Sequence, residues 1–178
     1  MKQSIILMAL IGSILSACGG SEPSPPTAPE KPQAKATPAV NPAIDYTDPI
    51  ELKKPTLNIA ELVKASGLRE VERIKRDDVV VHLLTPDGVP PVQIDERAER
   101  ISVGWWNYND EVKFKEINIA HNKAARRMVA ALTGSIEPFD KALRCEPTVS
   151  DFLNGQKISV SVICKNGQLS SAIVTAYR

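Results

Sequence analysis

The sequence predicts an α+β domain with a mainly antiparallel sheet of hairpins, two or three helices and a C-terminal β-hairpin. Two observations support this prediction. Short segments with alternating apolar and polar residues are joined by strong turn sequences, and segments with apolar residues at helical spacing lie between them. Because tight turns join antiparallel strands, whereas parallel strands need long crossover connections, we expect hairpins.

The first helix is expected to begin after Asn58. Asn58 is a good N-cap, Glu61 stands three residues later as in a capping box, and Gly67 can end the helix. The densely charged residues 69–77 that follow give no clear assignment.

Three strands are expected next. Residues 79–84 are rich in β-branched residues and stop at the turn sequence of residues 85–88. Residues 89–94 form a short strand that the Pro90-Pro91 pair would confine to an edge of the sheet. Ile101, Val103 and Trp105 then alternate on one face of a further strand.

A turn at residues 107–110 is expected to lead into a paired strand. Val112 and Phe114 are in phase with each other, whereas Ile117 and Ile119 are out of phase, which indicates a bulge near Glu116.

A second helix is expected to begin at Asn122 and to end at Gly134, with a shorter third helix over residues 136–144. The buried face of the second helix is expected to consist of Ala125, Met128, Val129 and Leu132.

The C-terminal hairpin is the clearest element, because Asn166-Gly167 favours a type I′ turn.

The first 17 residues have the features of a cleavable signal rather than of a folded element. Lys2 makes the start positive, and the apolar stretch that follows is about 10 to 12 residues long, too short to span a bilayer as a helix. The sequence Leu15-Ser16-Ala17-Cys18 then resembles the lipobox of bacterial lipoproteins. The resemblance implies that the chain is cut before Cys18 and that Cys18 carries the lipid, which would anchor the mature protein in a membrane.

The resemblance also bears on location. Gly19, rather than Asp, follows the lipidated cysteine, which by similarity favours the outer membrane, and thus the periplasm or cell surface, in a host with two membranes. Residues 18–48 are rich in proline and poor in large apolar residues, so we expect a disordered linker that tethers one globular domain over residues 49–178.

Two cysteines remain for the exported domain, Cys145 and Cys164. Disulfides persist outside the cytoplasm, so we expect these two cysteines to form one. The alternative is a pair of buried thiols.

No catalytic, cofactor-binding or metal-binding motif is apparent. The sequence has two histidines, His82 and His121, no zinc-binding spacing and no Gly-rich phosphate loop. Lys and Arg number 22 and Asp and Glu 21, so the basic excess typical of nucleic-acid binders is missing. A pair of carboxylates brought together by the fold remains an alternative.

Two clusters suggest a binding surface. Trp105 is in phase with the apolar face of its strand, so Trp106 points to the opposite face, near Tyr108. On the expected paired strand, Lys113 and Lys115 share that face. An aromatic side chain beside lysines on an exposed sheet would suit an acidic, partly apolar partner. The alternative is that a helix covers this face and that Trp106 belongs to the core.

The second cluster is Lys123, Arg126 and Arg127, near the expected start of the second helix. Because cations there oppose the helix dipole, they could bind an anionic partner such as a lipid head group, or they could form a solvated helix face.

These features favour a membrane-anchored envelope lipoprotein that acts as a non-enzymatic module for binding a protein partner. The alternative function is a cell-wall or lipid-binding carrier or hydrolase with a carboxylate/Arg site.

Overall fold

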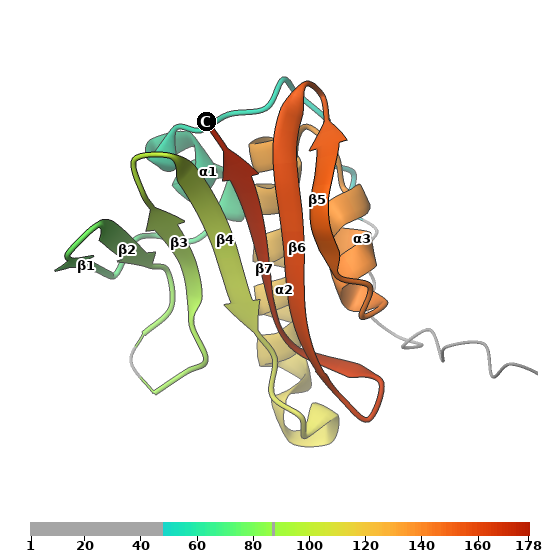
Figure 1. Cartoon of the computed structure of the whole chain (residues 1–178). Helices are drawn as coiled ribbons and strands as arrows, with labels where there is room; N and C mark the ends of the chain where they lie inside the picture. Colours follow the sequence, from blue (N-terminus) through green and yellow to red (C-terminus); the bar gives the residue numbers. More distant parts are fainter. Residues whose placement is uncertain (1–47, 87) are drawn as a thin grey trace, which may run out of the picture. The chain divides into compact units, whose positions relative to one another are not determined.

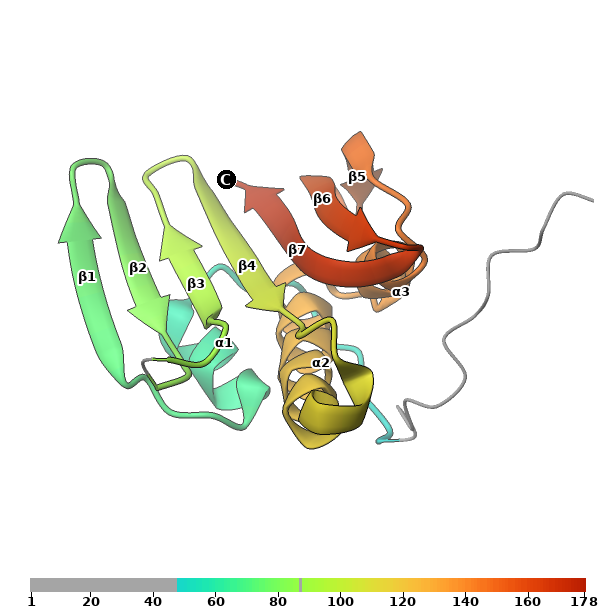
Figure 2. The same ribbon diagram turned by 90° about the horizontal axis from the view of Figure 1, so that it is seen from below.

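An antiparallel sheet with helices on one of its faces makes up the part of the chain that the structure describes. The computed structural model describes residues 48–86 and 88–178, and the expected signal peptide, Cys18 and the tether up to residue 47 lie outside them. Figures 1 and 2 show the three helices together on one side of the sheet. The elements are, in chain order, α1 (Ile59–Ser66), β1 (Glu72–Arg76), β2 (Val79–Leu83), β3 (Val92–Glu96), β4 (Arg100–Trp106), α2 (Glu111–Thr133), α3 (Glu137–Leu143), β5 (Thr148–Leu153), β6 (Gln156–Lys165) and β7 (Gln168–Tyr177).

The strand order is β1-β2-β3-β4-β7-β6-β5, and every neighbouring pair is antiparallel. The two edge strands are therefore β1 and β5, which lie at opposite ends of the sheet in Figure 2. The α+β prediction is confirmed.

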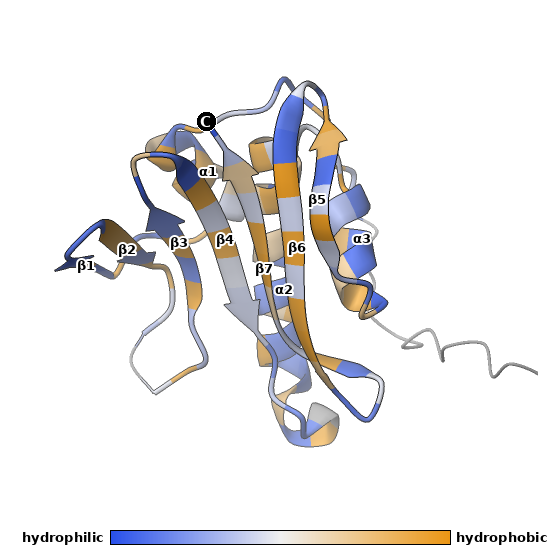
Figure 3. Cartoon of the chain, in the orientation of Figure 1, coloured by the Kyte–Doolittle hydropathy of each residue, from blue (hydrophilic) through white to orange (hydrophobic). Residues whose placement is uncertain are grey.

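The side chains of strand β4 show which face of the sheet the helices cover. Ile101, Val103 and Trp105 are fully buried against the helices, and the Trp105 ring stacks on Phe139 of α3 with their centroids 5.5 Å apart. Because side chains alternate along a strand, Ser102, Gly104 and Trp106 face the other side, which we call the open face. Figure 3 shows apolar residues alternating with polar ones along the first half of β4 and most of β6.

The first helix has the ends that its sequence predicts. The Asn58 Oδ1 accepts a hydrogen bond from the Glu61 backbone N–H at 3.2 Å. Gly67 follows the helix with a φ of 73°, in the left-handed region that glycine adopts without strain.

Helix α2 begins eleven residues before the predicted N-cap, since it starts at Glu111 and Asn122 lies inside it. The predicted strand through Val112 and Phe114, with its bulge near Glu116, is therefore wrong. Asp110 caps the helix by accepting a hydrogen bond from the Lys113 N–H at 3.1 Å. The backbone departs from helical geometry at Phe114, so the first turn is set off by a kink.

Polar side chains form the buried side of the first half of α2, which explains why apolar periodicity missed it. Asn118 exchanges two hydrogen bonds with the Tyr108 backbone, at 2.8 and 2.9 Å. Asn122 is fully buried and accepts a hydrogen bond from the Trp105 indole N–H at 3.1 Å. These side chains satisfy polar groups at the end of β4. The predicted apolar face of the second half of α2 is confirmed by the burial of Ala125, Met128, Val129 and Leu132.

The position of β3 corrects a second prediction. The Pro90-Pro91 pair lies before the strand rather than within it, so the backbone donors of Val92–Glu96 are intact. Strand β3 therefore pairs on both sides, with β2 and β4, and is not an edge. Edge strand β5 was not predicted, and residues 69–77, which contain β1, had no assignment from the sequence.

The C-terminal hairpin is confirmed. Asn166 and Gly167 have φ values of 53° and 77°, as the two central residues of a type I′ turn require. Helix α3 also lies within the predicted range. None of the helices in the described residues combines the length and apolar character that crossing a bilayer requires.

The predicted disulfide is present between Cys145 and Cys164. Their sulfur atoms are 2.03 Å apart and their Cα atoms 6.2 Å apart, and 19 positions separate them in the sequence. The bond joins the segment after α3 to the end of β6.

Removing this disulfide is expected to destabilise the domain. A Cys145→Ser and Cys164→Ser double variant should lose about 3 kcal/mol of unfolding free energy, because the crosslink restricts the unfolded chain. Urea unfolding measures the change, and the wild-type protein with a reducing agent is the matched control. Equal stability of the variant and the oxidised protein would contradict the assignment.

A candidate binding groove on the open face

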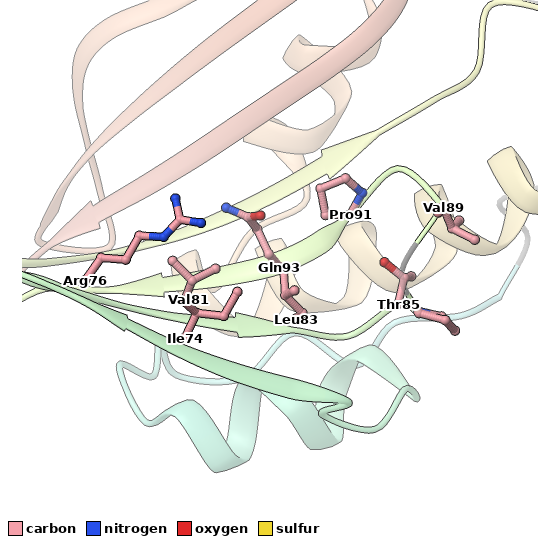
Figure 4. A pocket seen from close by; sticks show the side chains of 10 residues that line it. Ile74, Arg76, Val81, Leu83, Thr85, Val89, Pro91 and Gln93 are labelled. Atoms are coloured by element: carbon pink, nitrogen blue, oxygen red, sulfur yellow. The ribbon is translucent and has the colours of Figure 1, made fainter.

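A groove of about 290 Å³ lies on the open face of β1, β2 and β3. Figure 4 shows its side chains, which come from these strands and from the β2–β3 connection. The groove is mostly apolar, with polar groups from Arg76, Gln93 and Thr85. Its apolar lining consists of Ile74, Val81, Leu83, Pro86, Val89 and Pro91.

The strand register builds the floor of this groove. Ile74 of β1 is opposite Val81 of β2, and Leu83 of β2 is opposite Gln93 of β3. Directly opposite residues in an antiparallel pair point to the same face, so the four side chains form one continuous surface. Helices cover the other face only, so this surface remains half-exposed.

Arg76 gives the groove a positive charge at one end. Among the residues described, no carboxylate forms an ion pair with the Arg76 guanidinium. Figure 4 shows the Arg76 guanidinium and the Gln93 amide turned toward the same space above Val81. An apolar ligand that carries a carboxylate matches this arrangement, because arginine binds carboxylates through two parallel hydrogen bonds.

Gln93 is oriented by its neighbour on the open face. The Gln93 side-chain N–H donates to Asp95 Oδ1 at 2.7 Å, which leaves the amide oxygen of Gln93 as an acceptor. Burial raises the pKa of Asp95, and the hydrogen bond from Gln93 opposes that rise. Gln93 can therefore accept a hydrogen bond from a ligand beside Arg76.

Trp106 lies on the open face, as its parity predicts, and it adjoins the groove. A Cβ atom added to Gly104 would be only 3.1 Å from Cζ3 of the Trp106 ring and 3.5 Å from Cγ of Gln93. The indole therefore lies over Gly104 beside Gln93. Trp106 is partly exposed, and the helices lie on the other face of the sheet.

Tyr108 adjoins the groove at Gly88. Its hydroxyl donates to the carbonyl oxygen of Gly88, which lines the groove, at 3.4 Å. Its ring stacks on Phe114 with the centroids 3.9 Å apart. Tyr108 thus links the start of α2 to the β2–β3 connection.

The two lysines of the predicted surface do not lie on the sheet. Lys113 and Lys115 belong to the first turns of α2, because the paired strand on which their placement depended is a helix. The Lys113 ammonium lies 4.9 Å from the Phe114 ring centroid, and Lys115 is exposed. Of the predicted set, only Trp106 and Tyr108 adjoin the groove.

The sequence analysis missed the residues that form the groove itself. One signal was available, because Val79, Val81 and Leu83 alternate within a strand that was predicted correctly. The missing step was the β1 assignment, since the charged segment around Ile74 hides a single apolar position that pairs with Val81.

The basic cluster on α2 has a partner within the chain. Arg127 donates to the Asp48 carboxylate at 2.6 Å, Arg126 donates to the Asp48 backbone oxygen at 2.9 Å, and the Lys123 ammonium is 4.0 Å from the same carboxylate. The cluster lies in the middle of α2 rather than at its start. It fixes the beginning of the described chain to the helix layer, away from the open face.

His82 lies between two carboxylates, an arrangement that resembles an acid–base site. Its Nδ1 lies 3.1 Å from a Glu70 carboxylate oxygen and its Nε2 3.4 Å from one of Glu96, but the His82 side chain is only 3% exposed. In the part of the chain that the structure describes, its two ring nitrogens bond to these carboxylates and to no serine, threonine or cysteine. Its burial on the helix-covered face of the sheet favours a structural role, in which the bond to Glu70 joins β2 to the segment before β1.

His121 also has a structural contact. It lies inside α2 rather than before it, and its Nδ1 is 2.6 Å from the Trp106 carbonyl oxygen. Because a carbonyl can only accept, Nδ1 carries the proton. Burial lowers the pKa of His121.

The described residues contain no group of three or more side chains arranged to hold a metal ion. Comparisons of the chain with protein-family models, with curated proteins and with solved structures find no match. The functional inference therefore depends on the groove.

The Glu70 contacts predict a pH-dependent part of the stability. A hydrogen bond from Arg73 and, to a smaller extent, one from His82 lower the pKa of Glu70 below its usual value of 4.5. A lowered carboxylate pKa stabilises the fold above the unfolded-state value, and this contribution is lost as the pH falls through the folded-state pKa. The stability advantage of the wild type over Glu70→Gln should therefore be largest at neutral pH and shrink in acid below about 4.5.

Unfolding free energies measured across this pH range test the expectation. Glu72→Gln is the matched control, since Glu72 is exposed and has no ion pair among the described residues. A wild-type advantage over Glu70→Gln that does not change with pH would contradict it.

Proposed function

We propose that this protein is a membrane-anchored envelope lipoprotein that acts as a non-enzymatic adaptor, and that the groove on the open face binds an acidic, partly apolar segment of a protein partner. The observation that carries the proposal is the Arg76 guanidinium, which has no ion pair in the described chain and stands at the end of an apolar groove. The sequence-based expectation of an acidic, partly apolar partner is kept, with Arg76 in place of the two lysines.

The neighbours of the groove support binding of a protein. Trp106 lies beside Gln93, and Tyr108 holds the β2–β3 connection at Gly88. Tryptophan, tyrosine and arginine are the side chains that most often dominate protein interfaces. The groove is therefore flanked by residues that can extend the contact beyond the volume of the groove.

The attachment of the chain to the domain agrees with an adaptor. Asp48 is held by Arg126 and Arg127 in the helix layer, while the groove lies on the opposite face of the sheet. A tether that reaches the domain through Asp48 leaves the open face accessible to a partner.

A lipid carrier has weaker support. The groove volume of about 290 Å³ is at the lower limit of small-molecule pockets, which typically enclose roughly 300 to 1,000 Å³ and bury most of the ligand. The groove is open along the sheet and would leave a long acyl chain exposed. It suits the side chains of a peptide better.

The membrane anchor is tested at Cys18. A Cys18→Ser variant is expected to lose palmitate labelling and to move to the soluble fraction, because the thiol that accepts the lipid is gone. Membrane fractionation with radiolabelled palmitate measures both effects. Continued labelling and membrane retention of the variant would reject Cys18 as the anchor.

The groove is tested by reversing the charge of Arg76. Arg76→Glu should reduce the recovery of specific envelope proteins that co-purify with the wild type by about tenfold or more, since it replaces the attracting charge with a repelling one. Quantitative mass spectrometry compares it with Lys165→Glu, an equal charge change at the exposed β6–β7 turn. Melting temperatures confirm that both variants fold.

Equal recovery with Arg76→Glu and with Lys165→Glu would reject the groove as the binding site. Hydrolysis of peptidoglycan or lipid by the purified protein would reject the non-enzymatic function.

A further inference from the structure

The outer edge of β1 is an unpaired sheet edge beside the groove. Strand β1 ends the sheet, and two of its side chains, Ile74 and Arg76, line the groove. Its five residues pair with β2 without a register shift. The opposite edge strand, β5, has a shift between Thr148 and Asp151, which disturbs the regular spacing of its backbone groups.

The hydrogen-bond pattern shows which backbone groups of β1 are free. Leu84 N–H donates to Val92 O at 2.8 Å, so alternate residues of β2 from Leu84 backwards turn toward β3. The residues between them turn toward β1, and their partners there are Glu72, Ile74 and Arg76. The N–H and C=O groups of Arg73 and Lys75 therefore point away from the sheet, and no described residue bonds to them.

We propose that the partner segment binds as an added strand along β1. Its backbone pairs with Arg73 and Lys75, and its alternate side chains extend over Ile74 and Arg76 into the groove. Strand addition takes its affinity from main-chain hydrogen bonds and its specificity from side-chain pockets, and β1 offers both in one place. This inference rests on the groove being the binding site.

The charges of β1 define the sequence of the added strand. Arg73 is neutralised by Glu70 at 2.8 Å, whereas Glu72, Lys75 and Arg76 have no ion pair within the described chain. Figure 3 shows the resulting polar character of β1. Acidic residues are therefore favoured opposite Lys75 and Arg76, an apolar residue opposite Ile74, and a basic one opposite Glu72.

Charged residues at a sheet edge also protect it against indiscriminate pairing. A second copy of this chain would place Glu72 opposite Arg76, but it would also place Arg73 opposite Lys75. Two paired strands of five residues each would bury far less surface than the ~1,600 Å² that stable interfaces commonly bury. An acidic segment satisfies both cations and adds contacts in the groove.

A designed peptide tests the strand. In antiparallel order, the residues opposite Arg76, Lys75, Ile74, Arg73 and Glu72 are glutamate, glutamate, leucine, threonine and lysine. This peptide, flanked by threonines, blocked at both ends and labelled with fluorescein, is titrated into the mature chain carrying Cys18→Ser. Fluorescence anisotropy should detect saturable binding that Arg76→Glu removes.

Two N-methylated peptides separate strand addition from binding by side chains alone. A methyl group on the threonine nitrogen blocks a donor that faces β1, and affinity should fall by about tenfold or more. A methyl group on the leucine nitrogen, which points away from β1, is the matched control and should have a much smaller effect. Hydrogen exchange should slow at the amides of Arg73 and Lys75 and stay unchanged at Ile74.

If the two methylated peptides bound equally and the amides of Arg73 and Lys75 gained no protection, strand addition would be overturned. If Arg76→Glu still removed binding in that case, the groove would remain the binding site. Binding that Arg76→Glu does not affect would count against the groove as well. A wild-type dimer that Lys75→Pro converts to a monomer, whereas Lys75→Ala does not, would show that the edge pairs with a second copy and overturn the acidic partner.

Discussion

The packing of α2 and α3 against the Trp105 face of β4 is the contact on which the rest of the structure depends. Ile101, Val103 and Trp105 are fully buried there, and strand alternation then commits Gly104 and Trp106 to the open face. The same alternation runs across the sheet through the register, so that Gln93, Leu83 and Val81 also face away from the helices. The groove is thus a consequence of which face the helices cover.

A polar contact positions the helix that covers this face. The buried Asn122 side chain accepts from the Trp105 indole, and a buried indole N–H without a partner would cost about 1 to 3 kcal/mol. The requirement for polar partners at the end of β4 places Asn118, His121 and Asn122 on the buried side of α2. The interior of this domain therefore includes residues that a hydrophobic pattern assigns to the surface.

The open face and the β1 edge together carry the proposed binding function. The groove supplies apolar contact and one cation, and the edge supplies backbone donors and acceptors at Arg73 and Lys75. His82, the described histidine with two carboxylate neighbours, is buried and hydrogen-bonds to no nucleophilic side chain among the described residues. Binding needs the first two features, whereas acid–base chemistry would need an accessible form of the third.

The sequence alone determined the elements with strong local signals. Asn58 and Gly67 delimit α1, Asn166-Gly167 forms the hairpin turn, and the remaining cysteines form the disulfide, because each depends on backbone preferences or on chemistry. The opposite orientations of Trp105 and Trp106 follow from strand parity in the same way. Tertiary structure decided the start of α2, the interior position of β3 and the pairing of β1, since each depends on a partner distant in the sequence. The groove therefore emerged only when the pairing of β1 with β2 placed Ile74 and Arg76 beside Val81 and Leu83.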